Sequence, residues 1–230
     1  LITPSSNYHI LSVKINGVPQ QLPEDLKQPM YITVSNITAK TVIAVVFEGD
    51  TYSVTATAGE NGSISPSGII NANFGTSVFF TMTPDDGYKV SEIWVNGKYA
   101  GNGNTYNFTT NVLSSENTVE VIFERQTYTP SWTIQGNGSI VMNGSSPIRH
   151  GESREFTISP DEHYHFTNAY LTIGGDHYNP IAGDNNDIYS FTDNGGDYTL
   201  ILKNVTGNVL INLIISIDTY DVSITPGSNG

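Results

Sequence analysis

The sequence predicts a mainly β protein made of small β-rich modules in tandem, an elongated array with mixed or antiparallel sheets. Short stretches alternate apolar and polar residues, for example Tyr52–Ala56 and Val78–Met82, which is the pattern of half-buried strands. Turn sequences rich in glycine, asparagine and proline separate these stretches. The chain also repeats itself, with Tyr52 and Tyr128 in equivalent places, which indicates tandem modules.

The repeat is clearest when the chain is shifted by 76 positions, because identical residues then meet over the first half of Thr51–Glu124. The matched residues are Tyr52, Gly62, Gly68, Gly75, Phe80, Pro84, Asp85 and Tyr88, which meet Tyr128, Gly138, Gly144, Gly151, Phe156, Pro160, Asp161 and Tyr164. We therefore predict the second half of a module at 1–49, a complete module at 50–125, a third module at 126–217 and the start of a fourth at 218–230.

The first segment supplies the closing strands of a module. Thr3–Gly17 matches Thr83–Gly97, and Thr41–Phe47 is a β-branched run of the kind found in buried strands. Asn16-Gly17 predicts a two-residue hairpin turn, since both of its positions need positive φ. The loop Val18–Pro29 contains three prolines and cannot be a central strand.

The complete module continues with a strand at Val78–Met82. Pro84–Gly87 predicts a turn, because proline fixes φ and glycine accepts the left-handed position. Tyr88–Val95 and Asn117–Glu124 are further strands. No segment keeps a helical period, so at most one helical turn is expected, near Asn111–Glu116.

The third module follows the same order as far as Gly175 and then carries an insertion at 176–197. Within the insertion, Tyr189–Thr192 copies Tyr106–Thr109, which favours an extra hairpin. Trp132 aligns with Ala56 on the apolar face of its strand, so we expect it in the core.

Composition excludes several classes of function. The 230 residues include only 9 Lys and Arg against 22 Asp and Glu, so no basic patch exists for nucleic acid or an anionic membrane. The absence of cysteine excludes disulfides, thiolate catalysis and thiolate metal sites. No apolar run approaches the roughly 18 to 20 residues of a membrane span, so we expect no direct membrane insertion.

Five short patterns in the complete module carry a family resemblance. They are Tyr52-x-Val54, Asn61-Gly-Ser-Ile64, Thr81-x-Thr-Pro-Asp-x-Gly-Tyr-x-Val90, Val95-Asn-Gly97 and Val119-x-Val-x-Phe123. Together they resemble the divergent internalin-type B repeat, which occurs in tandem in secreted and surface-anchored bacterial proteins. The resemblance implies a β-grasp-like module that serves as a stalk or display element. The third module departs from the pattern at His163, which replaces the turn glycine.

A search for catalytic chemistry finds no nucleophile elbow, no His-Glu-x-x-His pattern, no phosphate-binding glycine loop and no helix-loop-helix calcium loop. We therefore expect no enzyme, no catalytic residues and no cofactor. His163 and His165 share a strand face and, with His177, could hold a metal, but the repeat favours a solvated pair.

Binding candidates gather in two places. Trp94 lies at an outward position of its strand and marks a contact surface, which either a neighbouring module covers or a ligand uses as a platform. The insertion carries aromatic candidates at Tyr178, Tyr189 and Phe191. Its aspartates could ligate calcium, although solvated aspartates in an extra hairpin are the simpler interpretation; the calcium candidates are Asp184, Asp187 and Asp193.

These observations favour a non-catalytic repeat segment of a bacterial cell-surface or secreted protein, located outside the cell. It would act as a spacer and in adhesion, with neighbouring modules and a host or cell-surface protein or glycan as partners. The alternative is a carbohydrate-binding module attached to a secreted glycan-degrading enzyme, with Trp94 in its platform. A glycan array would separate the two.

Overall fold

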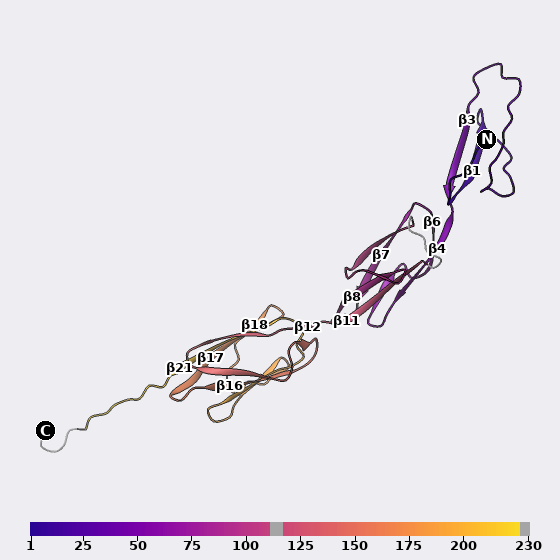
Figure 1. Ribbon diagram of the computed structural model, residues 1–230. Helices are drawn as coiled ribbons and strands as arrows, with labels where there is room; N and C mark the ends of the chain where they lie inside the picture. The colour runs from indigo at the N-terminus through magenta and orange to yellow at the C-terminus, as the bar shows by residue number, and fades with distance from the viewer. Residues whose placement is uncertain (111–116, 226–230) are drawn as a thin grey trace. The chain divides into compact units, whose positions relative to one another are not determined.

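The computed structural model describes residues 1–110 and 117–225 (Figure 1). Every regular element in this part of the chain is a β-strand, so the predicted mainly β fold class is confirmed. The helical turn predicted near Asn111–Glu116 lies outside the described residues. No described segment forms a helix that is long and apolar enough to cross a membrane.

The chain divides into two compact units. The first comprises Leu1–Asp85 and Lys89–Glu124, and the second comprises Asp86–Tyr88 and Arg125–Gly230. The predicted half module and most of the predicted complete module therefore fall together in the first unit, whereas Asp86–Tyr88 and Arg125 belong to the second. The finer division into modules stays a prediction.

The first unit opens with a three-stranded antiparallel sheet of order β2-β1-β3. Its strands are β1 (Tyr8–Ile15), β2 (Val18–Pro19) and β3 (Ile43–Gly49). The turn between β1 and β2 has φ of 50° at Asn16 and 82° at Gly17, so the predicted hairpin turn is confirmed.

A five-stranded sheet of order β6-β4-β11-β8-β9 follows in the same unit. It consists of β4 (Thr51–Ala58), β6 (Gly68–Asn73), β8 (Tyr88–Val95), β9 (Lys98–Gly101) and β11 (Thr118–Arg125). β4 and β11 pair in parallel, with Ala56 opposite Val119. The opening and closing strands of the repeat are thus neighbours in the sheet, although most of the module separates them in sequence.

A second sheet packs against the inner face of this one. It has the order β10-β7-β5 and is made of β5 (Gly62–Ser65), β7 (Ser77–Pro84) and β10 (Thr105–Thr109). Alternate side chains of both sheets meet between them, as the pleat requires. The buried residues are Val54, Ala56, Ile64, Phe80, Met82, Val90, Ile93, Phe108, Val119, Val121 and Phe123.

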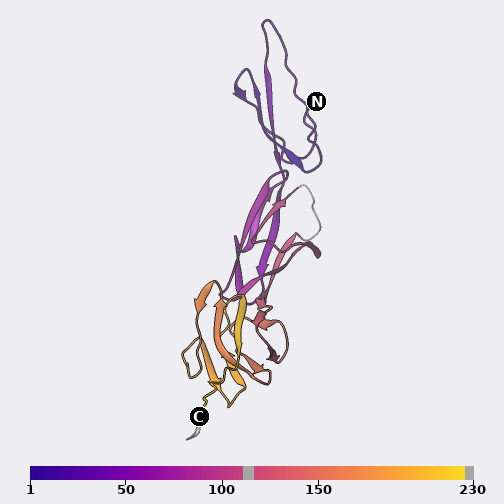
Figure 2. The same cartoon turned by 90° about the vertical axis from the view of Figure 1, so that its left-hand side faces the viewer.

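The second unit also has two main sheets, whose strands run alongside one another in both views (Figures 1 and 2). One has the order β13-β21-β17-β18 and the other β14-β16-β20-β19, with the short pair β12-β15 beside them. The strands are β12 (Thr127–Tyr128), β13 (Ser131–Gln135), β14 (Gly138–Asn143), β15 (Ile148–Arg149), β16 (Arg154–Pro160), β17 (Tyr164–Ile173), β18 (Asp176–Tyr178), β19 (Tyr189–Asp193), β20 (Tyr198–Leu202) and β21 (Val209–Ile217).

The core of the second unit repeats the plan of the first. Phe156 is fully buried in the second core, as Phe80 is in the first. β13 pairs in parallel with β21, so Trp132 lies opposite Ile211 just as Ala56 of β4 lies opposite Val119 of β11. The buried residues are Ile140, Ile148, Phe156, Ile158, Ala169, Leu171, Ile173, Tyr189, Phe191, Leu200, Leu202, Val205, Val209, Ile211 and Leu213.

The expectation that Trp132 lies in the core is wrong. Its side chain is 38% exposed and contacts Phe156 edge to face at 6.0 Å between ring centroids. The reason is local: Pro130 separates β12 from β13, so β13 is an edge strand, whereas β4 has β6 on its outer side. The larger side chain therefore stands at the rim of the core.

The insertion folds into strands rather than a loose loop. β18 extends the sheet by pairing with β17, and β19 pairs antiparallel with β20. In the first unit β10 pairs with β7, and Tyr106 lies opposite Phe80. In the second unit β20 takes the equivalent place beside β16, and Leu200 lies opposite Phe156. The strand whose sequence copies β10 is β19, and it lies one place further out.

Candidate functional site

A cluster of polar contacts in the first unit centres on Asp50, the single residue between β3 and β4. Its N–H donates to the carbonyl oxygen of Asn7 at 2.8 Å, and its own carbonyl accepts from the N–H of Phe74, also at 2.8 Å. Gly49 fits here because a Cβ would lie 2.4 Å from the carbonyl oxygen of Phe74. The backbone is thus bonded to the preceding sheet on one side and to the following module on the other.

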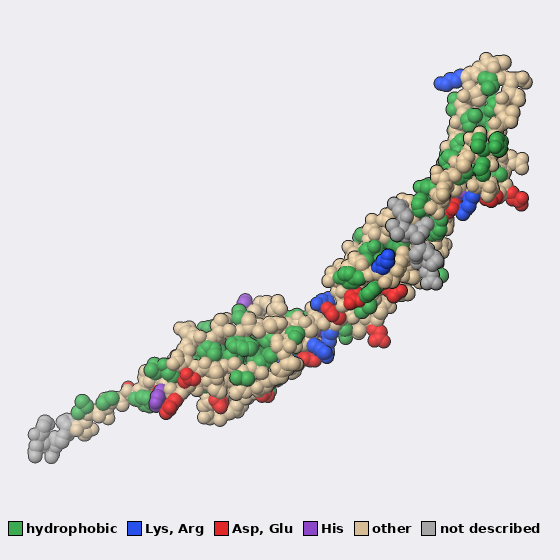
Figure 3. Space-filling model, in the orientation of Figure 1, with side chains coloured by type: hydrophobic (Ala, Val, Ile, Leu, Met, Phe, Trp, Pro, Cys, Tyr) green, Lys and Arg blue, Asp and Glu red, His purple; other side chains and the backbone are tan. Residues whose placement is uncertain are grey.

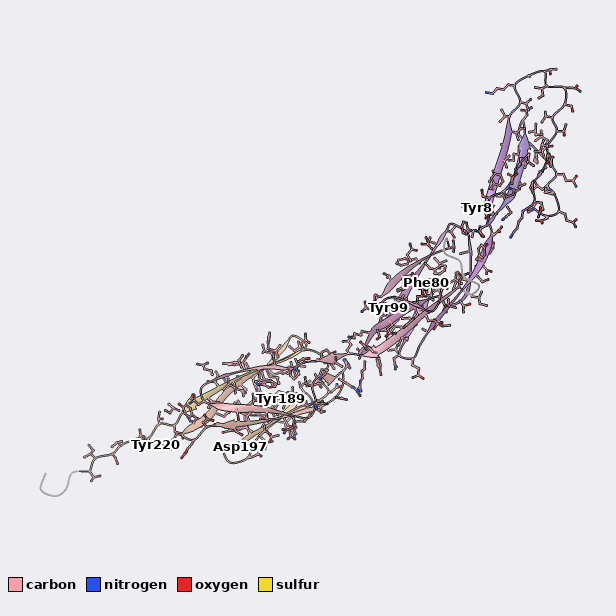
Figure 4. All side chains as sticks on the ribbon, in the orientation of Figure 1. Tyr8, Phe80, Tyr99, Tyr189, Asp197 and Tyr220 are labelled. Carbon is pink, nitrogen blue, oxygen red and sulfur yellow. The ribbon has the colours of Figure 1, made fainter. Side chains whose placement is uncertain are left out.

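Side chains reinforce this connection. The buried carboxylate of Asp50 contacts Nζ of Lys27 at 2.7 Å and Nδ1 of His9 at 3.1 Å. The hydroxyl of Tyr52 donates to Oδ1 of Asn7 at 2.8 Å. Tyr8, labelled in Figure 4, packs edge to face on Phe74 with ring centroids 5.5 Å apart.

The charge of Asp50 is stabilised in this arrangement. The hydrogen bond from Lys27 lowers the pKa of the Asp50 carboxyl, burial opposes that effect, and the contact with His9 adds to the lowering. The same ion pair raises the pKa of Lys27. Both groups are therefore charged at neutral pH, which favours a structural ion pair over acid–base catalysis.

The backbone pattern at Asp50 recurs in the second unit. The N–H of Gln126 donates to the carbonyl oxygen of Gly87, and the carbonyl of Gln126 accepts from the N–H of His150, each at 2.8 Å. At the end of β21, the N–H of Asp218 donates to the carbonyl oxygen of His163 at 2.8 Å, and Nδ1 of His165 contacts Oδ1 of Asp218 at 2.8 Å.

The histidine candidates have separate partners. His165 contacts Asp218, whereas Nδ1 of His177 lies 3.0 Å from Oγ1 of Thr172. His163 lies at an exposed turn, 3.7 Å from Glu162. No group of three or more metal-ligating side chains is found in residues 1–110 and 117–225.

The aromatic candidate of the first unit is Trp94, which lies on β8 directly opposite Tyr99 of β9. The two rings meet edge to face with centroids 6.2 Å apart, and Nε1 of Trp94 donates to Oε2 of Glu92 at 2.6 Å. Tyr99 is 59% exposed and Trp94 is half-buried. Ile93 points the other way into the core. The outer face of this sheet thus carries an aromatic pair beside a carboxylate.

The aromatic candidates of the insertion are mostly internal. Phe191 is fully buried and Tyr189, labelled in Figure 4, is 6% exposed, so neither ring offers a platform to solvent. Tyr178 is half-buried and meets Tyr189 edge to face at 6.0 Å. Desolvation by burial raises the pKa of Tyr189, and the hydrogen bond to Asp184 raises it further.

The calcium candidates make local hydrogen bonds. Oδ2 of Asp184 accepts from the hydroxyl of Tyr189 at 3.0 Å and from the N–H of Ile181 at 3.1 Å. Oδ1 of Asp193 accepts from the N–H of Gly195 at 2.8 Å in the turn between β19 and β20. Asp187 instead lines a hollow of about 140 Å³ in the second unit, together with Asp176, Tyr178 and Lys203. Calcium binding therefore stays a prediction that only a titration can test.

Sequence reasoning missed Asp50, Lys27 and Asn7. Lys27 lies in the proline-containing loop, and nothing in its local sequence indicates that it reaches Asp50. The signal available was positional, because Asn7, Gly87 and His163 share one turn position of the repeat, and all three have positive φ, of 67°, 75° and 70°.

Comparison with known proteins supports the resemblance drawn from the sequence. Residues 52–127 match a family model described as a divergent InlB B-repeat domain. This segment covers the complete module of the chain. No curated protein matches.

Two solved structures with low similarity are multidomain titin fragments. One, a chimeric titin Z1Z2-Z1Z2 tandem functionalized with a GRGDS exogenous peptide from fibronectin, is 10% identical, covers 70% of this chain and 94% of its own, and has a TM-score of 0.18. The other, the I-band fragment I67-I69 from titin, is 7% identical, covers 91% of this chain and 88% of its own, and has a TM-score of 0.14. The fold class of this chain rests on its own strands.

Proposed function

We propose that this chain is a non-catalytic spacer segment of a bacterial cell-surface or secreted protein. The match of residues 52–127 to a B-repeat domain supports a surface-protein repeat. The observation that carries the spacer role is the connection at Asp50, where one residue is bonded through its N–H, its carbonyl and its carboxylate. Because these three groups hold the residue that joins β3 to β4, the chain bends less at this connection. A spacer requires such stiffness.

The composition of the surface fits this role. Neutral polar side chains and backbone cover most of the visible face, and Lys and Arg are sparse (Figure 3). Such a surface has little attraction for nucleic acid or anionic lipid. The proposal includes neighbouring modules as partners and a location outside the cell, which the match of residues 52–127 to a B-repeat domain supports.

The spacer role can be tested with two spin labels in the first unit. The chain contains no cysteine, so cysteines introduced at the exposed positions Lys14 and Thr81 would be the only labelling sites. We expect one narrow distance distribution in the parent. Insertion of Gly-Ser-Gly-Ser between Asp50 and Thr51 should broaden it, because the bonds of Asp50 no longer act on both sides.

A matched control places the same four residues between Val34 and Ser35, in the segment that precedes β3. This insertion lengthens the chain equally but leaves the connection intact, so the distribution should stay narrow. A broad distribution in the parent would contradict the spacer proposal.

A carbohydrate-binding role is the second candidate, favoured by Trp94 and Tyr99 beside Glu92. Aromatic rings next to carboxylates are a common way to hold sugars, and Tyr99 is well exposed. A glycan array with the parent and the Trp94→Ala variant tests it. Binding that is lost in the variant would favour this candidate, and the absence of binding by the parent would leave the spacer role alone.

A further inference from the structure

The insertion of the third module lines a polar pocket in the second unit. Its walls come from β18 and from the loop before β19 on one side, and from the turn after β20 on the other. In the complete module the corresponding strands β9 and β10 are joined by only three residues, 102–104. The longer connection between β18 and β19 therefore adds Asp187 and Ile188 to the lining of the pocket.

Lys203 holds the inserted wall in place. Its Nζ donates to Oδ1 of Asn185 and to the carbonyl oxygen of Asn186, each at 2.6 Å. Its backbone N–H donates to the carbonyl oxygen of Ile188 at 2.7 Å. These three bonds fasten the loop to the end of β20, so the pocket exists before any ligand arrives.

The opposite wall is fixed by a close backbone approach. A Cβ on Gly207 would lie 2.3 Å from the Cα of Gly174, so the two glycines let the turn after β20 lie directly against the end of β17. The N–H of Gly174 also donates to the carbonyl oxygen of Asn208 at 3.0 Å. The hollow between the walls has a volume of about 140 Å³ and is open to solvent.

The groups in the pocket offer both donors and acceptors. Asp176 and Asp187 supply carboxylate acceptors, and Lys203 supplies an ammonium donor. The Asn204 amide and the Thr206 hydroxyl can act as either, and the half-buried ring of Tyr178 gives an apolar surface. Two carboxylates against one ammonium leave the pocket negative, within a chain whose net charge is -13.

We propose that this pocket binds a neutral sugar residue, such as the end of an uncharged glycan. Sugar hydroxyls donate and accept hydrogen bonds, which matches a mixed lining, and the faces of a pyranose pack on aromatic rings. The net negative charge disfavours acidic sugars and phosphates. The proposal adds a ligand to the spacer and rests on the third module alone, separate from Trp94.

The test is a titration of the full 230-residue chain, labelled with ¹⁵N, with D-glucose, D-galactose, D-mannose and N-acetyl-D-glucosamine in turn. We expect at least one of these sugars to shift the amide signals of Asp176, Asp187 and Asn204 in a saturable way. D-glucuronic acid should bind more weakly than D-glucose. Shifts induced by none of the four neutral sugars would overturn the proposal.

Two variants locate the site. Asp187→Asn replaces an exposed carboxylate by a neutral amide of the same shape. It should weaken sugar binding about tenfold, which is the loss expected for one charge-assisted hydrogen bond. Asp193→Asn, which changes a carboxylate at the end of β19 and outside the pocket, should bind as the parent does. Equal weakening in both variants would contradict the assignment.

The outcomes also separate this proposal from the others. Binding that survives Asp187→Asn but is lost in Trp94→Ala would move the sugar site to the first unit. Binding of arginine amide in place of every sugar would make the pocket a receptor for cationic peptides and would overturn the sugar assignment. Neither result changes the distance measurement that tests the spacer role.

Discussion

His163 shows how one backbone position constrains the choice of residue. Its φ of 70° lies in the left-handed region, where the equivalent positions carry Asn7 and Gly87. We expect His163→Val to lower the free energy of unfolding of the second unit by about 1 to 2 kcal/mol, because a β-branched side chain is strained there. His163→Asn, the matched control, should cost little. Urea unfolding monitored by tryptophan fluorescence would measure both, and a Val variant as stable as the Asn variant would contradict the account.

Asp50 gives a prediction about pH. The hydrogen bond from Lys27 lowers the folded-state pKa of its carboxyl, so its contribution to stability is present above the ordinary aspartate pKa of about 3.9 and is lost as the pH falls through the folded-state value. We therefore expect Asp50→Asn to lower the free energy of unfolding of the first unit by about 1.5 to 3 kcal/mol at neutral pH. The difference from the parent should shrink below a pH of about 4.

Denaturant unfolding of both proteins across this pH range would measure that difference. Glu60→Gln is the control, since Glu60 is an exposed carboxylate of the same unit and its loss should matter little at any pH. A difference that stays constant from neutral to acidic pH would show that the charge of Asp50 is not the stabilising feature.

At the scale of elements, the insertion tests the calcium hypothesis. Asp184 already accepts hydrogen bonds from Tyr189 and Ile181, so we expect Asp184→Ala to lower the stability of the second unit by about 1 to 3 kcal/mol, equally in calcium and in EDTA. Thermal melting in both buffers measures this, with Asp197→Asn, in the exposed turn shown in Figure 4, as the control. A parent protein that melts higher in calcium, with the gain lost in Asp184→Asn, would establish a calcium site.

The strands that the sequence predicted best are those with strict alternation and a clear turn beside them. β4 and β7 follow from apolar side chains at every second position, and the hairpin turn after β1 follows from Asn16-Gly17. These signals are local, so a single sequence suffices to find them. The choice of neighbouring strands is not local, which explains why the parallel pairing of β4 with β11 was not foreseen.

The insertion was harder to predict for the same reason. Its copy of the β10 sequence correctly indicated a strand at β19 and a hairpin, but β20 takes the place beside β16. Leu200 and Leu202 are both fully buried, so the more apolar strand occupies the inner position. The burial of Tyr189 and Phe191 follows from the pairing of their strand and could not be inferred from the polar composition around them.

At the scale of the whole molecule, the candidate site was less predictable than the fold. Trp94 could be placed on an outer face because Ile93 and Val95 alternate with it. The Asp50 cluster and the pocket beside Lys203 are formed by segments far apart in sequence: Lys27 reaches Asp50, and the turn after β20 meets the inserted loop. Sequence periodicity contains no information about contacts between segments that lie far apart in the sequence.

The two units have separate cores, so we expect them to unfold separately. Phe80 and Phe156 occupy equivalent, fully buried positions, one in each core. Removal of either ring should cost about 3 to 5 kcal/mol in its own unit, through lost burial and the cavity that remains. Phe80→Ala should therefore lower or abolish one calorimetric transition, and Phe156→Ala the other, while the remaining transition keeps the temperature it has in the parent. Near-ultraviolet circular dichroism would assign the transitions, since each unit holds one tryptophan, Trp94 or Trp132. If either substitution moved both transitions together, the two units would form one cooperative structure, and the stabilising contacts would extend beyond the cores described for each.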